Sequence, residues 1–198
     1  MAVTQMASNF FVLQVMTGEE QRFIALANKA ITRASEDRRY EDNGEAEYRF
    51  WWPRRKLRIR RRGRTFPTLT PLFPGYVFLE TETMTDLLFR AIRRTTGFIR
   101  FLKSNDDIRP LSDEDMGLIR HFLSFGEIVT ELKVTFDENN RIVVKEGPLL
   151  GLEGKIVKVD RRKGRAKVKL DMYENAFLID LAFEMLEPGK EPEREESA

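Results

Sequence analysis

The stretch Pro71-Leu72-Phe73-Pro74-Gly75-Tyr76-Val77-Phe78-Leu79-Glu80 decides the fold of this chain. Its two prolines remove backbone amide donors, so no central strand can run through residues 71–74. Pro74-Gly75 is a turn dipeptide, and the aromatic and branched residues that follow predict a strand from Tyr76 to Thr81. Side chains alternate along a strand, so Tyr76 and Phe78 share one face. Because both faces of this strand are apolar, both must be covered.

What packs against the two faces of this strand has two interpretations. One face would be covered by the protein's own helices and the other by a partner, because an exposed cluster of Phe73, Tyr76 and Phe78 would be an apolar patch. The alternative is a central core strand that is covered only by this chain.

Composition limits the class of protein. The chain has 198 residues, of which 41% are hydrophobic and 33% charged, and its net charge is +2. This length allows one or two modest domains. There is no cysteine and one histidine, His121, which excludes disulfides and argues against a His-based triad or metal site. Neither a signal peptide nor a membrane-spanning run of roughly 20 apolar residues is expected. We expect a cytoplasmic binding protein without a cofactor, not an enzyme.

The residues around the central strand predict an α+β domain over residues 8–126. Phe10 to Val15 is a short apolar run that predicts a strand, and Glu19 to Ala34 has the apolar spacing of a helix. Thr83 to Arg94 predicts a second helix, and Ser112 followed by Asp115 is a capping pattern that starts a third. The order β-α-β-β-β-α-β-α indicates helices packed against an antiparallel sheet. His121 on the third helix is interpreted as structural or exposed.

A basic segment lies between Glu47 and Glu80, where there is no acidic residue. Leu57 and Ile59 alternate with cations, which predicts a two-stranded ribbon that turns at Arg62-Gly63. Arginine forks match phosphate geometry and nearby aromatics can stack on unpaired bases, so the ribbon predicts nucleic-acid contact, without choosing DNA or RNA. The alternative is a solvated basic loop. The candidate residues are Arg54, Arg55, Lys56, Arg58, Arg60, Arg61, Arg62 and Arg64.

A second unit is predicted over residues 141–187, after a linker at 127–140 that lacks periodicity. About five short strands separated by turn signals, the last two at Asn175 to Asp180 and Phe183 to Leu186, predict a small all-β barrel. One of its turns is basic and is a second candidate nucleic-acid contact, with a solvated hairpin tip as the alternative. The candidate residues of this turn are Arg161, Arg162, Lys163 and Arg165. Residues 188–198 are rich in Pro and Glu and predict a disordered tail.

Two of these segments carry a resemblance to a known family. The residues from Leu72 to Phe78 resemble the central strand of the N-terminal (NGN) domain of the NusG family of transcription elongation factors. The segment Val144 to Leu170, with glycines spaced Gly-x-x-x-Gly-x-x-Gly and a basic turn, resembles a KOW motif. Because both motifs occur in the order of the family, the chain is identified as a member from Phe10 to roughly Glu187.

The resemblance implies a function and a set of partners. RNA polymerase would dock through its clamp helices on Phe73, Pro74, Tyr76 and Phe78, with Arg22 near the polymerase or nucleic-acid side. Such a factor would promote processive elongation or antitermination. The barrel would bind RNA or a protein. For the basic ribbon, nascent RNA is the favoured ligand ahead of non-template DNA.

Departures from the family pattern leave alternatives open. Lys56 stands where an acid is expected, which makes the ribbon more basic. Met172-Tyr173-Glu174-Asn175 replaces an aromatic followed by Gly-Arg, a region that the family uses to contact termination factor Rho or ribosomal protein S10. These changes look more like a specialised antitermination paralog, such as LoaP, than like the general factor. The alternatives are a general NusG acting with Rho or S10, and a ribosome-associated KOW protein that binds RNA.

Overall fold

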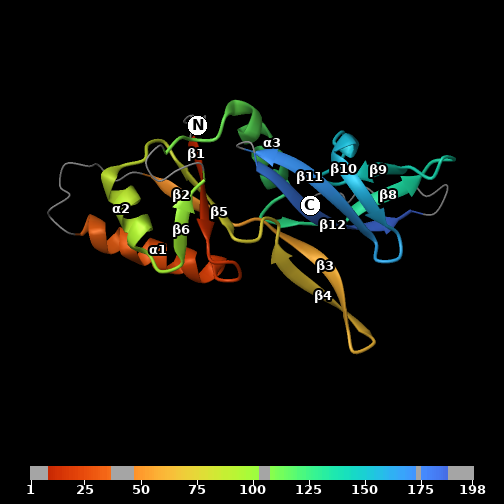
Figure 1. Cartoon of the computed structure of the whole chain (residues 1–198), viewed down its shortest axis with the longest axis horizontal. Helices are drawn as coiled ribbons and strands as arrows, with labels where there is room; N and C mark the ends of the chain where they lie inside the picture. Colours follow the sequence, from red (N-terminus) through yellow and green to blue (C-terminus); the bar gives the residue numbers. More distant parts are fainter. Residues whose placement is uncertain (1–8, 37–46, 103–107, 173–174, 187–198) are drawn as a thin grey trace, which may run out of the picture. The chain divides into compact units, whose positions relative to one another are not determined.

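The computed structural model describes residues 9–36, 47–102, 108–172 and 175–186. The chain divides into two units (Figure 1). The first unit comprises Met1–Trp52 and Phe73–Gly117, and the second comprises Pro53–Leu72 and Leu118–Ala198. The predicted tail at 188–198 and the dipeptide Tyr173-Glu174 lie outside the described residues.

The first unit is built on a four-stranded sheet with the order β2-β5-β1-β6. All three pairings in it are antiparallel. The strands are β1 (Asn9–Val15), β2 (Tyr48–Trp51), β5 (Tyr76–Thr81) and β6 (Phe98–Phe101). The predicted central strand is therefore β5, which lies between β1 and β2.

Two helices, α1 (Glu20–Ser35) and α2 (Asp86–Arg94), pack on one face of this sheet (Figure 1). The buried stripe of α1 is Phe23, Ala27 and Ile31, whose spacing of four residues places them on one side of a helix. These side chains share a core with Val77 and Leu79 of β5. Strand alternation therefore directs Tyr76 and Phe78 to the face away from the helices.

The third helix, α3 (Asp113–Leu123), starts where its capping pattern predicts. The Ser112 hydroxyl accepts a hydrogen bond from the Asp115 backbone N–H at 3.2 Å. Ser112 thus satisfies one of the amide groups that a helix start leaves unpaired. His121, in the last turn of α3, places its Nε2 2.7 Å from the Pro148 carbonyl oxygen.

The predicted basic ribbon is a hairpin of the second unit. It consists of β3 (Arg54–Arg61) and β4 (Arg64–Pro71), and β3 also pairs in parallel with the two-residue strand β7 (Ile128–Val129). The turn lies at Arg62-Gly63, as predicted, with positive φ angles of 48° and 78°. Two successive positive φ values give the turn a twist that matches antiparallel strands.

The rest of the second unit is a curled, five-stranded sheet with the order β10-β11-β12-β8-β9 (Figure 1), called the barrel below. A short 3₁₀ helix (Glu153–Lys155) precedes β10. The strands are β8 (Leu132–Phe136), β9 (Ile142–Glu146), β10 (Ile156–Asp160), β11 (Arg165–Met172) and β12 (Asn175–Met185). The predicted class, an α+β unit with a small all-β barrel, is confirmed.

Two details of the predicted barrel are corrected. Residues 127–140, predicted to be a linker, contain β7 and β8. Leu132 and Val134 are fully buried there on either side of Lys133, so the segment has the alternation of a strand. Two strands were predicted within 175–186, whereas β12 runs unbroken from Asn175 to Met185. Asp180 does not end it, because its neighbours Ile179 and Leu181 fill the inward positions.

No helix in the part of the chain that the structure describes is both long and apolar enough to cross a membrane.

Candidate functional site

The turn before β5 is held by two hydrogen bonds to the junction of β1 and α1. The Gly75 N–H donates to the Glu20 carboxylate at 2.7 Å, and the Gly75 carbonyl accepts from the Val15 N–H at 2.8 Å. A Cβ atom added to Gly75 would lie 2.7 Å from the Thr17 hydroxyl oxygen. Glu20 is 1% exposed, so its carboxylate is a buried acceptor within the fold. These contacts set where Tyr76 enters the sheet.

The predicted polymerase anchors differ in exposure. Phe73 and Phe78 are 1% and 0% exposed, and their rings meet edge to face with centroids 5.3 Å apart. Tyr76 is half-buried and Pro74 is exposed. Of these four residues, Tyr76 and Pro74 therefore reach the surface, while the two phenylalanines are buried. Arg22 is exposed on α1, where it pairs with Glu19 at 3.1 Å.

The hairpin separates its cations by strand alternation. Lys56 and Arg58 are exposed on either side of Leu57, which is 5% exposed. Arg62 and Arg64 are exposed at the turn, and Arg54 pairs with Glu127 at 3.5 Å. The side chains of Arg60 and Arg61 lie outside those that the structure describes.

Arg55 is not one of the exposed cations of the hairpin, although the charge pattern predicts that it contacts nucleic acid with them. The residue is 8% exposed, and its Nη1 donates to the Leu72 carbonyl at 2.9 Å. Burial lowers the pKa of the Arg55 guanidinium below its ordinary value. Arg55 lies two positions before Leu57, so it shares the inward face of β3. Its fork therefore holds the end of β4 and is not available to a phosphate.

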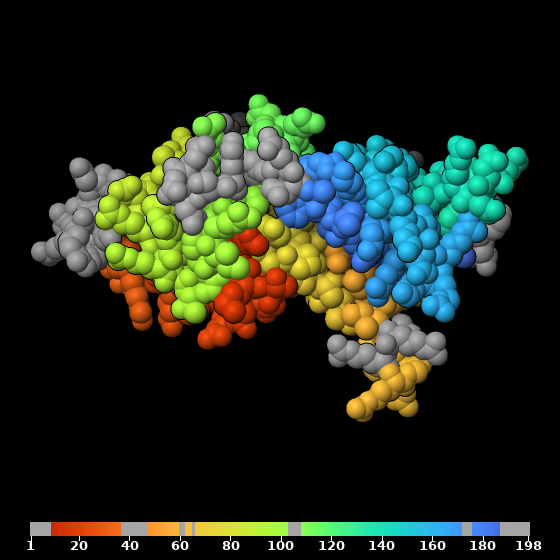
Figure 2. All heavy atoms as spheres, in the orientation of Figure 1, coloured from red at the N-terminus to blue at the C-terminus, as the bar shows by residue number. Residues whose placement is uncertain are grey.

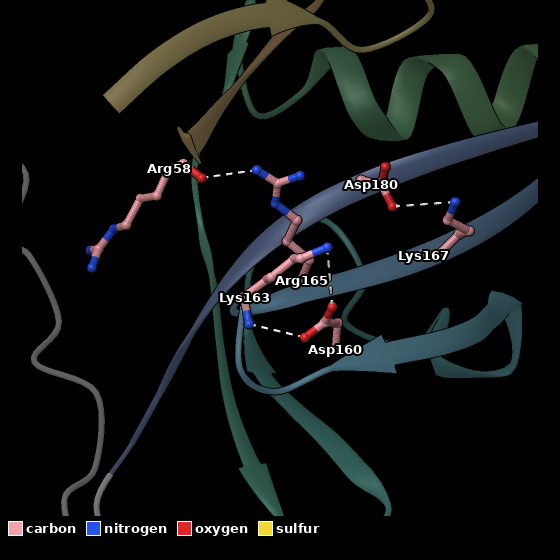
Figure 3. Close-up of polar contacts among 6 residues, drawn as sticks. All are labelled: Arg58, Asp160, Lys163, Arg165, Lys167 and Asp180. Atoms are coloured by element: carbon pink, nitrogen blue, oxygen red, sulfur yellow. Dashed lines mark hydrogen bonds and ion pairs between the residues drawn. The ribbon is translucent and has the colours of Figure 1, made fainter. Parts of the chain in front are cut away.

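The basic turn between β10 and β11 is organised by Asp160. One carboxylate oxygen accepts from the Lys163 N–H at 3.0 Å, and the other lies 3.7 Å from the Lys163 Nζ (Figure 3). The backbone hydrogen bond from Lys163, more than any nearby charge, lowers the pKa of the Asp160 carboxyl. This local arrangement leaves Arg162 exposed at the turn.

Arg161 is turned toward the β8–β9 side of the barrel. Its guanidinium carbon lies 3.6 Å from the centroid of the Phe136 ring, and its Nη2 donates to the Asn140 carbonyl at 3.1 Å. Arg161, which was predicted to contact nucleic acid, therefore makes its contacts within the barrel. The charge run gave no sign of this contact, because Phe136 is distant in the sequence.

The hairpin and the barrel turn, predicted as separate candidates, lie together in the second unit. The Nη2 of Arg165 donates to the Arg58 backbone carbonyl at 2.8 Å (Figure 3). Arg58 directs its own guanidinium away from Arg165, and both its Nε and its Nη2 lie 3.3 Å from the Glu131 carboxylate. Figure 2 shows the hairpin tip extending clear of the blue strands of the barrel.

A cleft of about 820 Å³ opens between these two elements, and we call it the hairpin–barrel cleft. Cations outnumber acids in its lining, with Glu131 as the one carboxylate among the described lining residues. A second hollow of about 170 Å³ shares Lys163 and Arg165 with it and continues to Lys158 and Lys167. The lining of the larger cleft is Arg58, Ile59, Gly63, Glu131, Arg162, Lys163, Gly164, Arg165, Ala182 and Phe183.

The cations among the described lining residues are suited to an anion. Guanidinium and ammonium groups donate several hydrogen bonds and carry fixed positive charge, which suits phosphate oxygens. Among the described residues, no group of three or more His, Cys, Asp and Glu side chains forms a metal-binding cluster. Sequence reasoning did not identify Glu131 as a cleft residue, because it lies in the segment predicted to be a linker.

Known proteins that this chain resembles carry the name of one family. Residues 8–120 match the family model described as "Transcription termination factor nusG". "Transcription termination/antitermination protein NusG" of Yersinia pestis is 30% identical over 120 residues, which cover 59% of this chain and 65% of that protein. The protein of the same name from Halalkalibacterium halodurans is 25% identical over 185 residues, covering 92% and 99%.

A solved structure supports the fold alone. The structure described as "Domain interaction in Thermotoga maritima NusG" matches with a TM-score of 0.52 and 21% identity, over 89% of this chain and 94% of that one. The first unit and the barrel accordingly fit an NGN-type unit with a KOW-type barrel. The family model matches more than half of the 198 residues of this chain, and the chain therefore belongs to the NusG family of transcription termination factors.

Proposed function

We propose that this chain is a transcription elongation factor that binds RNA polymerase through the β5 face carrying Tyr76 and Phe78. It acts by binding and not as an enzyme, promoting processive elongation or antitermination. Membership of the family supports a role in transcription, since relatives are named for termination and antitermination. The polymerase clamp helices are the partner that we assign to this face.

The observation that carries the proposal is the division of the β5 side chains between two faces. Val77 and Leu79 are used in the core beneath α1 and α2, whereas Tyr76 and Phe78 point the other way. Tyr76 and Pro74 reach the surface, so a partner meets them first. Phe73 and Phe78 are buried within the chain, so they can contact a partner only after the residues that cover them have moved. Buried aromatic anchors dominate interface energies once they are desolvated by a partner.

A nucleic-acid contact is the second part of the proposal. The exposed cations of the hairpin and of the β10–β11 turn, with Arg58 and Arg162 as examples, are suited to a phosphate backbone. Nascent RNA is the ligand that we favour. Arg55 is left out of this set because it is buried, and Arg161 because its guanidinium lies on the Phe136 ring. Arg58 stays in the set although it pairs with Glu131, because its side chain is 64% exposed.

The test of polymerase binding is a pull-down with three variants of the full chain. Tyr76→Asp places a charge on the proposed face and is expected to abolish polymerase capture. Tyr76→Phe keeps the ring and should retain capture, and Lys29→Asp on the exposed side of α1 controls for charge alone. Thermal unfolding establishes that each variant is folded. Normal capture of polymerase by folded Tyr76→Asp would overturn the assignment of this face.

A further inference from the structure

We propose that Arg100 extends the polymerase-binding face of β5 and binds a carboxylate of the polymerase segment that contacts Tyr76. Gln14 orients the Arg100 side chain for this contact and is a positioning residue. The inference rests on the polymerase part of the proposed function, because it assigns a partner group to the same face. It is independent of the nucleic-acid part.

Tyr76, Gln14 and Arg100 form one row across three neighbouring strands, which we call the polar row. Gln14 lies opposite Tyr76 in the β1–β5 register and opposite Arg100 in the β1–β6 register. Residues directly opposite each other in an antiparallel pair project from the same face of the sheet. Arg100 therefore shares the face of Tyr76, away from α1 and α2. Two strand spacings separate them, which is roughly 10 Å across the sheet.

The polar row is the part of this face that a partner meets first along β1 and β5. The next pair in the register, Val12 and Phe78, is 2% and 0% exposed. Tyr76 and Gln14, by contrast, are half-buried, and Arg100 is exposed. A partner that reaches the half-buried Tyr76 ring therefore also lies within reach of the Arg100 side chain.

The Arg100 guanidinium is oriented by the fold but its charge is not offset. Its Nε donates to the Gln14 side-chain oxygen at 2.8 Å, and this amide carries no charge. Arg100 takes part in none of the ion pairs between described residues, whereas Arg22 and Arg90 on the helices pair with acids. The bond through Nε leaves the two terminal nitrogens of Arg100 to bind both oxygens of one carboxylate.

The composition of the polar row favours a carboxylate over a nucleic-acid backbone. A strand of nucleic acid needs a series of cations, because it presents successive phosphates. In the polar row Arg100 is the single charged residue, beside an amide and an aromatic ring. Tyrosine and arginine are also enriched where proteins bind proteins. We therefore assign Arg100 to an acidic side chain of polymerase.

The position of Arg100 determines the kinetic effect that we expect. β6 is an edge strand of the sheet, so Arg100 lies at the border of the face. A charge at the border of an interface acts mainly on the association rate and on its salt dependence. Arg100→Glu should therefore slow association with polymerase about tenfold at low salt, and Arg100→Ala a few-fold. Arg100→Lys keeps the charge without the fork and should lie between Arg100→Ala and the wild type.

The experiment measures association and dissociation rates of the full chain with purified core RNA polymerase, at low and at physiological salt. Arg33→Glu is the matched control, because Arg33 is an exposed cation in the last turn of α1, on the other side of the sheet. Thermal unfolding establishes that each variant is folded. Equal association rates for Arg100→Glu and Arg33→Glu would overturn the inference, while capture that depends on Tyr76 would still stand. If the wild type binds no polymerase, the inference and the polymerase part of the proposed function both fail.

The positioning role of Gln14 is tested in two backgrounds. Gln14→Ala keeps the charge of Arg100 but removes the group that orients it, so association should slow a few-fold. In Arg100→Ala the same substitution should have little further effect, because no guanidinium is left to orient. Additive losses would contradict the positioning role.

A titration with single-stranded RNA separates the two possible ligands of Arg100. Arg100→Glu should bind RNA as Arg33→Glu does, since both substitutions change the net charge equally. A greater loss of RNA affinity in Arg100→Glu, together with unchanged association with polymerase, would assign Arg100 to a phosphate and overturn the inference.

Discussion

The Glu20 carboxylate, 1% exposed, accepts a hydrogen bond of 2.7 Å from the Gly75 backbone N–H. Glu20 is the first residue of α1 and Gly75 immediately precedes β5, so this bond ties a helix start to the entry of the central strand. The carboxylate also lies in the first turn of the helix, where negative charge is favourable. A residue that looks like a solvated helix-start acid in the sequence is therefore a buried part of the fold.

We predict that Glu20→Ala destabilises the chain by about 1–3 kcal/mol, because the buried Gly75 N–H loses its acceptor. Glu20→Gln keeps an oxygen at the same place and should be less damaging. Glu19→Ala is the control, since Glu19 makes its ion pair with exposed Arg22. Urea unfolding measures the three free energies. A Glu20→Ala variant as stable as Glu19→Ala would show that the bond contributes nothing.

A second prediction concerns two glycines with similar backbone angles. Gly75 and Gly18 have φ values of 82° and 87°, so alanine at either position is strained by roughly 1–2 kcal/mol. A Cβ on Gly75 also meets the Thr17 hydroxyl at 2.7 Å, whereas a Cβ on Gly18 meets nothing within 4 Å. Gly75→Ala should therefore be the more destabilising, and Thr17→Ala should recover part of the difference. Equal unfolding free energies for the two glycine variants would refute this reading.

The burial of Arg55 predicts that its charge is dispensable. Arg55→Met removes a desolvated cation and one hydrogen bond to Leu72, and these opposing effects should keep stability within about 1 kcal/mol of the wild type. Affinity for single-stranded RNA should not change, in contrast to Arg58→Ala. Chemical unfolding and oligonucleotide titration provide the two measurements. A large loss of RNA affinity in folded Arg55→Met would return Arg55 to the binding set.

The β10–β11 turn should be sensitive to acid through Asp160. The hydrogen bond from the Lys163 N–H depresses the pKa of this carboxyl below its ordinary value of 3.8. A depressed pKa means that the carboxylate stabilises the folded turn above that ordinary value, and that the stabilisation is lost as the pH falls through the folded pKa. Carboxyl NMR titration should show Asp160 ionising at lower pH than an exposed Asp. In Asp160→Asn, exchange of the Lys163 amide should lose this pH dependence.

The contact of Arg161 with Phe136 predicts a small structural role. Arg161→Ala should destabilise the barrel by about 0.5–1 kcal/mol, the range of an exposed cation–π pair. In a double-mutant cycle with Phe136→Leu, the two losses should be less than additive, because they share one interaction. RNA affinity should fall far less than in Arg162→Ala. A loss of RNA affinity equal to that of Arg162→Ala would mean that Arg161 leaves Phe136 when RNA binds.

Much of the fold follows from short-range patterns that a sequence displays. The Arg62-Gly63 turn, the Ser112 cap and the apolar stripe of α1 were predictable, since each depends on residues within a few positions of one another. Such contacts are governed by local backbone angles and by helical spacing. The strand after Pro74-Gly75 was predictable for the same reason, and with it the family.

The functional surface depended on the tertiary structure. In the sequence Arg55, Arg58, Arg161 and Arg162 are equivalent cations. In the fold, Arg55 donates to a carbonyl, Arg161 lies on an aromatic ring and Arg58 pairs with a carboxylate, whereas Arg162 is exposed at a turn. The hydrogen bond that joins hairpin and barrel links residues 107 positions apart, Arg58 and Arg165. Charge patterns carry no information about such pairings, because a cation on a strand has the same sequence signature whether its neighbour is water, a carbonyl or an aromatic ring. Only packing decides which of these it meets.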